Sequence, residues 1–249
     1  MPRLLRGLYQ VGGATLTHPW EGSSYLVEDS GEAVLIDCGS HLGLEKLLEN
    51  IGKCGIKPEQ IRTIICTQGH FDHVEAAAHL KPEYENIKLA IHKADKTAVE
   101  SGDRERTCAS FFYDEPFHLP CNAEITLKGE EEISVGKISL RIIHLPGHSP
   151  GHIGILTEIS GLKLMFTGST LHGAYGLRVG GNLKDWKRSL HRLQELDFDL
   201  FVESHSNCVL YADPSPRIEE ALWKMETQYF QLLEAPFRKT RYEGPFRYP

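Results

Sequence analysis

Several features that define whole classes of protein are missing from this sequence. It has no run of about 18 apolar residues, the shortest length that spans a bilayer as a helix. The first six residues contain too few apolar side chains for a secretory signal peptide. We therefore expect a cytoplasmic protein with no membrane partner.

Paired cysteines and clustered basic residues are also missing. The six cysteines are dispersed, without a Cys-x-x-Cys pair, so we expect free and mostly buried thiols rather than a disulfide framework. The net charge is −7, and the longest basic stretch is at residues 238–241. Because phosphate contacts need clustered Lys and Arg, we expect no nucleic-acid partner; the motifs described below favour a small-molecule substrate instead.

The residues that are present have the balance of a folded globular chain. Of the 249 residues, 41% are hydrophobic and 24% are charged, which argues against disorder. The expected elements run strands, helix, strand, helix, and then repeat this order. The order predicts an α/β fold in which two β-rich halves form a sandwich with helices on both outer faces. We expect a single domain over residues 1–249, with its core at about 20–210 and a C-terminal helix and tail at 211–249.

Local patterns place the expected elements along the chain. Short apolar runs predict strands at 24–27, 33–36, 61–66, 88–92, 138–144, 151–156, 162–166 and 200–202. Apolar residues at helical spacing predict helices at 44–51, 74–80, 94–99 and 183–196, and a final helix that starts at Ser215. The stretch 102–121 has weak periodicity and several aromatic residues, so we expect a loop that can cover a site.

Four of the expected strands end in turns that carry metal-ligand or polar side chains. These side chains are Gln68, His70, Asp72, His73, His148, Ser169 and His205. Turns at strand ends can converge at one edge of a sheet, where a rigid scaffold presents them. Imidazole and carboxylate suit zinc, and also iron or manganese. Neighbouring side chains in a turn point in different directions, so two adjacent metal sites can form.

These motifs resemble those of the metallo-β-lactamase superfamily, whose pattern is T-H-x-H-x-D-H, then P-G-H, T-G-D and a late G-H. The matching stretches are TQGHFDH at 67–73, LPGHSPGH at 145–152, TGS at 167–169 and SH at 204–205. Asp37 and Gly39 also match the early D-x-G of the family. The first two motifs are specific and the last two are weaker. The resemblance covers roughly residues 20–210 and implies an αββα sandwich and a metal-dependent hydrolase.

The resemblance also implies two sets of metal ligands. The first set would be Gln68, His70 and His148. The second set would be Asp72, His73 and His205. This sequence departs from the family at two positions, because Gln68 replaces a His and Ser169 replaces an Asp that bridges both ions. A neutral amide is a weak zinc ligand, whereas the second set keeps three good ligands and an open position for water. We therefore predict one dominant Zn²⁺ in the second site and a weak or empty first site.

Roles for individual residues follow from this arrangement. Asp72 would ligate the metal and orient the attacking water, while His70 and His148 would donate hydrogen bonds or shuttle a proton. Three further residues are expected to bind substrate, namely Ser169, His172 and Tyr113. His172 lies three residues after Ser169, so it could instead reach the metal in place of the lost carboxylate.

The expected reaction is the attack of a metal-activated water on a small cyclic or activated acyl substrate, such as a lactone, a thioester, a β-lactam-like amide or a cyclic ketone. Gln68 and Ser169 also resemble some members of one metallo-β-lactamase subclass, which favours β-lactam hydrolysis, while the missing secretion signal disfavours it. Two alternatives stay open: a mononuclear iron oxygenase of the same fold, and a non-catalytic binding protein with a decayed site. The aromatic and basic tail at 235–249 could dock on a neighbouring subunit, which would make a homo-oligomer.

Overall fold

The computed structural model describes residues 1–112, 120–172 and 176–227, and within them the strands form two sheets. The first sheet contains, in spatial order, β1 (Arg3–Leu5), β2 (Leu8–Gly12), β3 (Ser24–Asp29), β4 (Glu32–Ile36), β5 (Ile61–Ile65), β6 (Lys88–His92) and β7 (Ile125–Leu127). Its first four strands pair antiparallel, and β4 to β7 pair parallel.

The second sheet has the order β13 (Tyr211–Ala212), β12 (Leu200–Val202), β11 (Leu162–Phe166), β10 (Ile153–Ile159), β9 (Ile138–His144) and β8 (Glu132–Val135). Only β11 and β12 pair parallel; the other neighbours are antiparallel. Because β9 and β11 are both antiparallel to β10, the strands β9, β11 and β12 all end at the same edge of the sheet.

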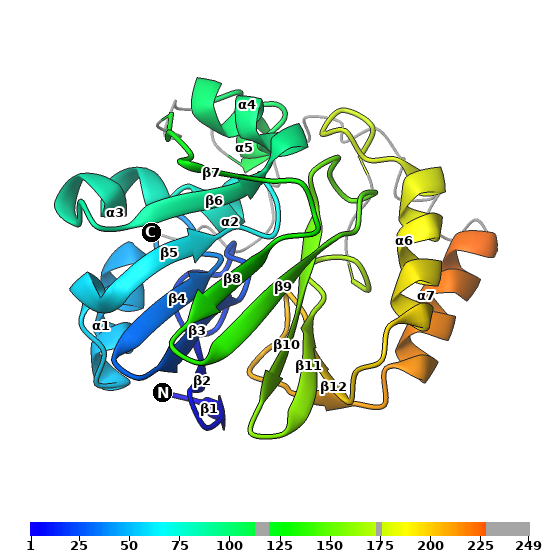
Figure 1. Ribbon diagram of the computed structural model, residues 1–249. Helices are drawn as coiled ribbons and strands as arrows, with labels where there is room; N and C mark the ends of the chain where they lie inside the picture. Colours follow the sequence, from blue (N-terminus) through cyan, green and yellow to red (C-terminus); the bar gives the residue numbers. More distant parts are fainter. Residues whose placement is uncertain (113–119, 173–175, 228–249) are drawn as a thin grey trace.

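Helices cover both outer faces of the paired sheets (Figure 1). On the first sheet lie α1 (Leu44–Lys53), α2 (Phe71–Val74), α3 (Ala77–Glu83) and α4 (Lys93–Ser101). On the second sheet lie α6 (Leu183–Glu195) and α7 (Ser215–Glu226). The short helices η1 (Pro58–Gln60) and α5 (Ala109–Phe112) lie in connections. The layers are therefore helix, sheet, sheet, helix, which confirms the predicted αββα sandwich.

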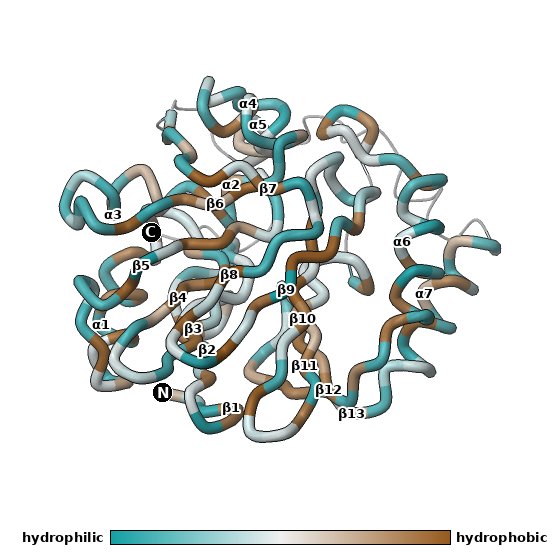
Figure 2. Tube along the Cα trace, in the orientation of Figure 1, coloured by the Kyte–Doolittle hydropathy of each residue, from teal (hydrophilic) through white to brown (hydrophobic). Residues whose placement is uncertain are grey.

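Strand β4 shows why its sequence forms a central strand. Its side chains alternate between two cores: Ala33 and Leu35 pack under the helices, while Val34 and Ile36 pack between the sheets. Successive side chains of a strand point to opposite faces, so a strand covered on both faces is apolar throughout. The hydropathy of the whole chain follows this pattern, with the hydrophobic segments gathered in the interior (Figure 2).

Most of the predicted elements are confirmed, with a few differences. The predicted helix at 74–80 is instead two short helices, α2 and α3, that meet at residues 75–76. The strand predicted from 151 begins at Ile153, and the strands β1, β2, β7, β8 and β13 were not individually predicted. All six cysteines are free, as expected, but only three of them are buried, namely Cys38, Cys66 and Cys121. Among the described residues, no helix has both the length and the apolar character needed to cross a bilayer.

Candidate functional site

The ends of strands from both sheets bring the predicted metal ligands together. Strand β5 leads into residues 67–73, β9 into His148, β11 into Ser169 and β12 into His205. A backbone hydrogen bond from the Ile153 amide to the Thr67 carbonyl connects the two sheets, and one from the Ser204 amide to the Gly168 carbonyl connects two neighbouring turns of the second sheet. The edge of the sandwich is thus a common rim for turns that lie far apart in the sequence.

Asp72, His73 and His205 form one compact group on this rim. Their ligand atoms all lie within 4.8 Å of one another. Asp72 Oδ2 is 3.3 Å from His73 Nε2 and 3.6 Å from His205 Nε2. The His73 side chain is fully buried, whereas 39% of the His205 side chain is exposed. The group therefore offers one carboxylate and two imidazoles, and the imidazole of His205 is open to solvent.

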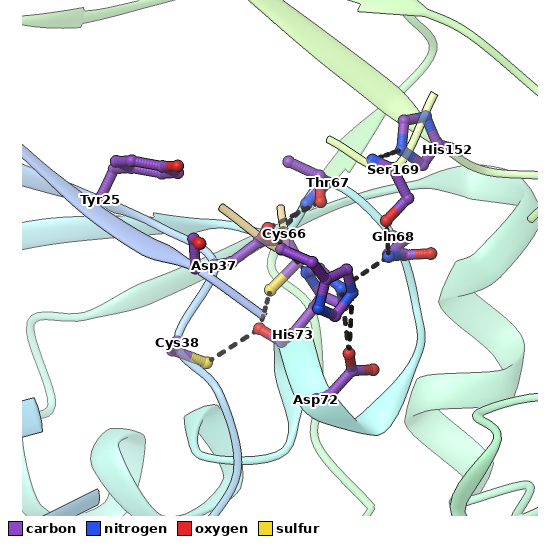
Figure 3. A network of polar contacts seen from close by, with 12 residues as sticks. Tyr25, Asp37, Cys38, Cys66, Thr67, Gln68, Asp72, His73, His152 and Ser169 are labelled. Carbon is purple, nitrogen blue, oxygen red and sulfur yellow. Dashed lines mark hydrogen bonds and ion pairs between the residues drawn. The ribbon is translucent and has the colours of Figure 1, made fainter. Parts of the chain in front are cut away.

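A second carboxylate fixes the orientation of His73 (Figure 3). Asp37 Oδ2 lies 2.8 Å from His73 Nδ1 and also accepts a 2.7 Å hydrogen bond from the Thr67 hydroxyl, while its Oδ1 accepts a 2.7 Å bond from the Thr67 amide. Asp37 adopts a left-handed backbone conformation with φ of 56°, which is uncommon for a residue other than glycine. By engaging Nδ1, Asp37 leaves His73 Nε2 directed at Asp72, as metal-binding histidines require.

The charges in this group stabilise one another. Burial opposes ionisation of Asp72, but His73, with further help from His205 and His70, holds the pKa of Asp72 well below its usual range. Burial alone would lower the pKa of His73, but the carboxylates of Asp72 and Asp37 raise that pKa to about 10. In the metal-free protein a proton on His73 thus supplies the positive charge that the two carboxylates favour.

Gln68, His70 and His148 lie beside this group and make up the other predicted ligand set. The rings of His70 and His148 are 4.7 Å apart between centroids. Gln68 Nε2 lies 2.7 Å from His73 Nε2 and donates a 3.0 Å hydrogen bond to Ser169 Oγ. Gln68 Oε1 and His70 Nε2 are both buried without a hydrogen-bond partner. Buried polar atoms are rarely left unpaired, so an ion or an ordered water at these two atoms would complete their bonding.

The three predicted substrate-binding residues differ in their placement. Ser169 is 1% exposed and its hydroxyl is engaged by Gln68, so it lies beneath the rim rather than on it. His172 is exposed and close enough to His205 to help lower its pKa, although burial is the larger cause. Tyr113 lies outside the described residues.

Asp95, at the start of α4, organises the site but was not predicted from the sequence. Its carboxylate accepts hydrogen bonds from the Gly69 amide at 3.0 Å, the Gly151 amide at 2.8 Å and the Ser149 hydroxyl at 2.5 Å. It therefore joins the turn that carries His70 to the turn that carries His148. The available signal is an acidic residue three positions after the end of strand β6, at the same edge as the ligands.

The residues on the rim fit a divalent transition metal. Asp72, His73 and His205 are the donor types that zinc prefers, and Asp37 supplies the oriented second contact of a metal-bound imidazole. Gln68 Oε1 and His70 Nε2, which have no hydrogen-bond partner, are two further atoms that an ion or a water molecule beside this metal would engage. Such a site can activate a water molecule and polarise a carbonyl group.

Comparison with known proteins agrees with this geometry. The family model described as the metallo-beta-lactamase superfamily matches residues 18–205. Hydroxyacylglutathione hydrolase GloC of Haemophilus influenzae is 29% identical over 157 residues, which are 61% of this chain and 66% of that protein. The human acyl-coenzyme A thioesterase MBLAC2 is 26% identical over 184 residues, which are 65% of this chain and 60% of that protein. The chain thus matches slightly less than two thirds of the length of these two relatives.

A solved structure shows the same fold. The class B3 di-zinc metallo-beta-lactamase LRA-12 from an Alaskan soil metagenome aligns with a TM-score of 0.73 over 93% of each chain. Its sequence is 20% identical to this one. At that identity the likeness establishes the common architecture of the two chains.

Proposed function

Because the chain belongs to the metallo-β-lactamase superfamily, we propose that it is a zinc-dependent hydrolase acting on a small activated acyl substrate. The observation that carries the proposal is the Asp72, His73 and His205 group, with His73 oriented by Asp37. This group would hold the dominant ion. Gln68, His70 and His148 would form a weaker second site, because one of its three donors is a neutral amide.

Bound zinc would supply a water of lowered pKa and an electrophile for the substrate carbonyl. The chain's own residues would position the reactants. Asp72 has two carboxylate oxygens, so it can ligate through one and accept a hydrogen bond from the attacking water through the other. Burial lowers the pKa of His70 to about 4, so its ring is neutral at pH 7. A neutral His70 can accept or donate one hydrogen bond at Nε2, according to its tautomer, and so can orient a water or a substrate.

Among activated acyl groups we favour a thioester. With zinc bound, Asp72 and His73 would be engaged as ligands, and His70 is neutral at pH 7, so none of these three residues is a ready proton donor for a leaving group. A thiolate leaving group, whose conjugate acid has a pKa of about 8.5, departs near neutral pH without prior protonation, whereas an amide nitrogen needs a proton. The names of two relatives, a hydroxyacylglutathione hydrolase and an acyl-coenzyme A thioesterase, support the same substrate class. The proposal also includes three other substrate classes, which are lactones, β-lactam-like amides and cyclic ketones.

The free state of all six cysteines supports a reducing compartment, and we propose the cytoplasm on that ground. Acylated thiols of glutathione or coenzyme A type would also be compatible with such a compartment, because free thiols persist there. A fractionation experiment that detects the native protein with an antibody tests this placement.

A substrate panel tests the function. Metal-depleted protein is reloaded separately with Zn²⁺, Fe²⁺ and Mn²⁺ and assayed on an acyl-coenzyme A, an acylglutathione, a lactone and a β-lactam, with oxygen uptake recorded in parallel. We expect zinc-dependent release of free thiol, detected with a chromogenic thiol reagent. Oxygen uptake that requires iron, without hydrolysis, would favour the oxygenase alternative. Inactivity of all three metal forms on every substrate would favour a binding protein.

A further inference from the structure

A second group of metal-ligand side chains lies outside the rim. His41 is in the loop after β4, Glu75 follows α2, and His79 is on α3. The ligand atoms of these three residues all lie within 4.8 Å of one another. Glu75 and His79 are four residues apart on a nearly continuous helical run, so their side chains share one face. The group therefore joins two chain segments and shares no residue with the Asp72 group.

Glu75 is a buried carboxyl group that contacts a histidine side chain, and burial lowers the pKa of that histidine, His41. The Glu75 side chain is 0% exposed, and Oε1 lies 2.9 Å from His41 Nδ1. The His41 amide donates a second bond to Oε2 at 3.4 Å. Within the part of the chain that the structure describes, neither a lysine nor an arginine forms an ion pair with Glu75. Burying a carboxylate costs free energy unless a cation or several donors compensate it.

His79 supplies an independent observation. Its Nε2 is buried and has no hydrogen-bond partner, although most buried ring nitrogens find one. The His41 and His79 rings are 5.7 Å apart between centroids, at an angle of 36°. The unpaired nitrogen of His79 lies next to a buried carboxylate and a second imidazole. A cation placed among these three groups would complete the bonding of all of them.

A neighbouring acidic residue adds to the negative potential at this position. Glu21 is 3% exposed and accepts hydrogen bonds from the Ser40 amide, the Ser40 hydroxyl and the Gly43 amide. Burial is the main cause that raises the pKa of Glu75 to about 8, and the nearby Glu21 adds to this effect. The loop that carries His41 is therefore attached to one buried carboxylate and faces another.

We propose that His41, Glu75 and His79 form a second, separate site for a divalent transition metal of the zinc type. Two imidazoles and one carboxylate are a donor set that zinc accepts, with a fourth position left for water. About a third of the His41 side chain, 32%, is exposed, which gives the ion a route from solvent. An ion there would tie the loop that follows Asp37 to the helix that follows His73, and so would brace both segments without entering the reaction.

Metal stoichiometry in matched variants tests this site independently of catalysis. The Asp72→Ala/His205→Ala variant removes two ligands of the rim group, and we expect it to retain one equivalent of Co²⁺ or Zn²⁺ after equilibrium dialysis. Adding His79→Ala to that variant should remove the remaining equivalent and its visible Co²⁺ absorption. In the otherwise unaltered protein, His79→Ala or His41→Ala should lower the metal content by one equivalent. The exposed residue His191 on α6 provides the control, since His191→Ala should change nothing.

Two results would overturn the site. One is a metal content that is the same in wild-type, His79→Ala and His41→Ala proteins of matched circular dichroism. The other is the absence of bound metal in the Asp72→Ala/His205→Ala variant at free zinc concentrations that saturate wild-type protein. The two sets of variants remove different ligands, so loss of the metal at Asp72, His73 and His205 is measured separately from loss of the metal at His41, Glu75 and His79. The result for the second site therefore does not depend on whether the protein is a hydrolase.

Discussion

At the scale of single residues, Asp37 has the strongest influence on a site that it does not enter. It holds the Thr67 amide, the Thr67 hydroxyl and His73 Nδ1 with three bonds of 2.7 to 2.8 Å. The carbonyl of His73 also accepts bonds from the thiols of Cys38 and Cys66 (Figure 3). Both the ring and the backbone of this ligand are therefore fixed before a metal binds.

Replacement of Asp37 tests this role. In Asp37→Asn the charge that supports the His73 Nδ1–H is lost, and one oxygen acceptor becomes a donor. We expect zinc affinity to fall about 10- to 100-fold, the usual effect of losing such a contact. Competition with a chromophoric chelator measures the change. An unaltered affinity in a folded Asp37→Asn protein would show that the carboxylate does not orient the ligand.

Asp95 acts on the structure of the site rather than on its dominant metal. Its replacement by Asn leaves at least one of the buried donors at Gly69, Ser149 and Gly151 without an acceptor. We expect Asp95→Asn to lower the free energy of unfolding by about 1 to 3 kcal/mol, the penalty for an unpaired buried group. Urea unfolding measures it, with Asp103→Asn, an exposed aspartate in a turn, as control. Equal stability of the two variants would contradict this account of Asp95.

At the scale of elements, the strands that carry ligands were the most predictable part of the fold. The segments β5, β9 and β11 are apolar runs with polar turns after them, because both faces of a central strand are buried. The strands β1 and β13 are two or three residues long, too short for a periodic pattern. The break between α2 and α3 was missed because three consecutive alanines favour an unbroken helix.

The candidate site was predictable only in part, for a physical reason. The ligands in residues 67–73 are neighbours in sequence, so their clustering is visible without a structure. The approach of His205 to Asp72, and that of His41 to Glu75, are tertiary contacts between separate segments. His205 was found through the resemblance of its motif. Glu75 and His79 were missed, since on an amphipathic helix such residues have no distinguishing pattern.

A histidine at the start of α4 is expected to make the stability of the fold depend on pH. His92 caps this helix, with its Nδ1 accepting from the Ala94 amide at 3.3 Å, and its ring stacks on His144 at 4.0 Å. Burial, followed by the proximity of His144, lowers the pKa of His92 to about 4. The folded state thus keeps His92 neutral while the unfolded chain takes up a proton below about pH 6.5. The stability from this neutral His92 is complete above pH 6.5 and is lost as the pH falls toward 4.

His92→Asn removes the titrating ring and keeps an acceptor for the helix cap. Between pH 7 and 5, we expect the free energy of unfolding of this variant to depend less steeply on pH than that of wild type. The difference in slope should be smaller than about 1.4 kcal/mol per pH unit, the maximum that one titrating proton can cause. Denaturant unfolding at several pH values measures the slope, and His191→Asn serves as the exposed control. An identical slope in wild type and His92→Asn would refute the assignment.

At the scale of the whole molecule, the proposed metal connects the two halves of the sandwich. Asp72 and His73 follow a strand of the first sheet, and His205 follows a strand of the second. A ligand that binds only the folded state stabilises it, by roughly 4 kcal/mol at a concentration 1,000 times its dissociation constant. We therefore expect a chelator to lower the melting temperature of the wild-type protein. In Asp72→Ala the same chelator should lower the melting temperature much less. A wild-type melting temperature that does not respond to a chelator or to added zinc would contradict this coupling.

One dominant metal at Asp72, His73 and His205 is the proposed source of hydrolytic activity. The most direct measurement is the zinc content of wild-type, Asp72→Ala and His148→Ala proteins at matched free zinc, with thioester hydrolysis assayed on the same samples. We expect Asp72→Ala to lose one equivalent of zinc together with the activity, and His148→Ala to keep that equivalent. An Asp72→Ala protein that retains the wild-type zinc content, or hydrolyses the thioester at the wild-type rate, would contradict the proposal.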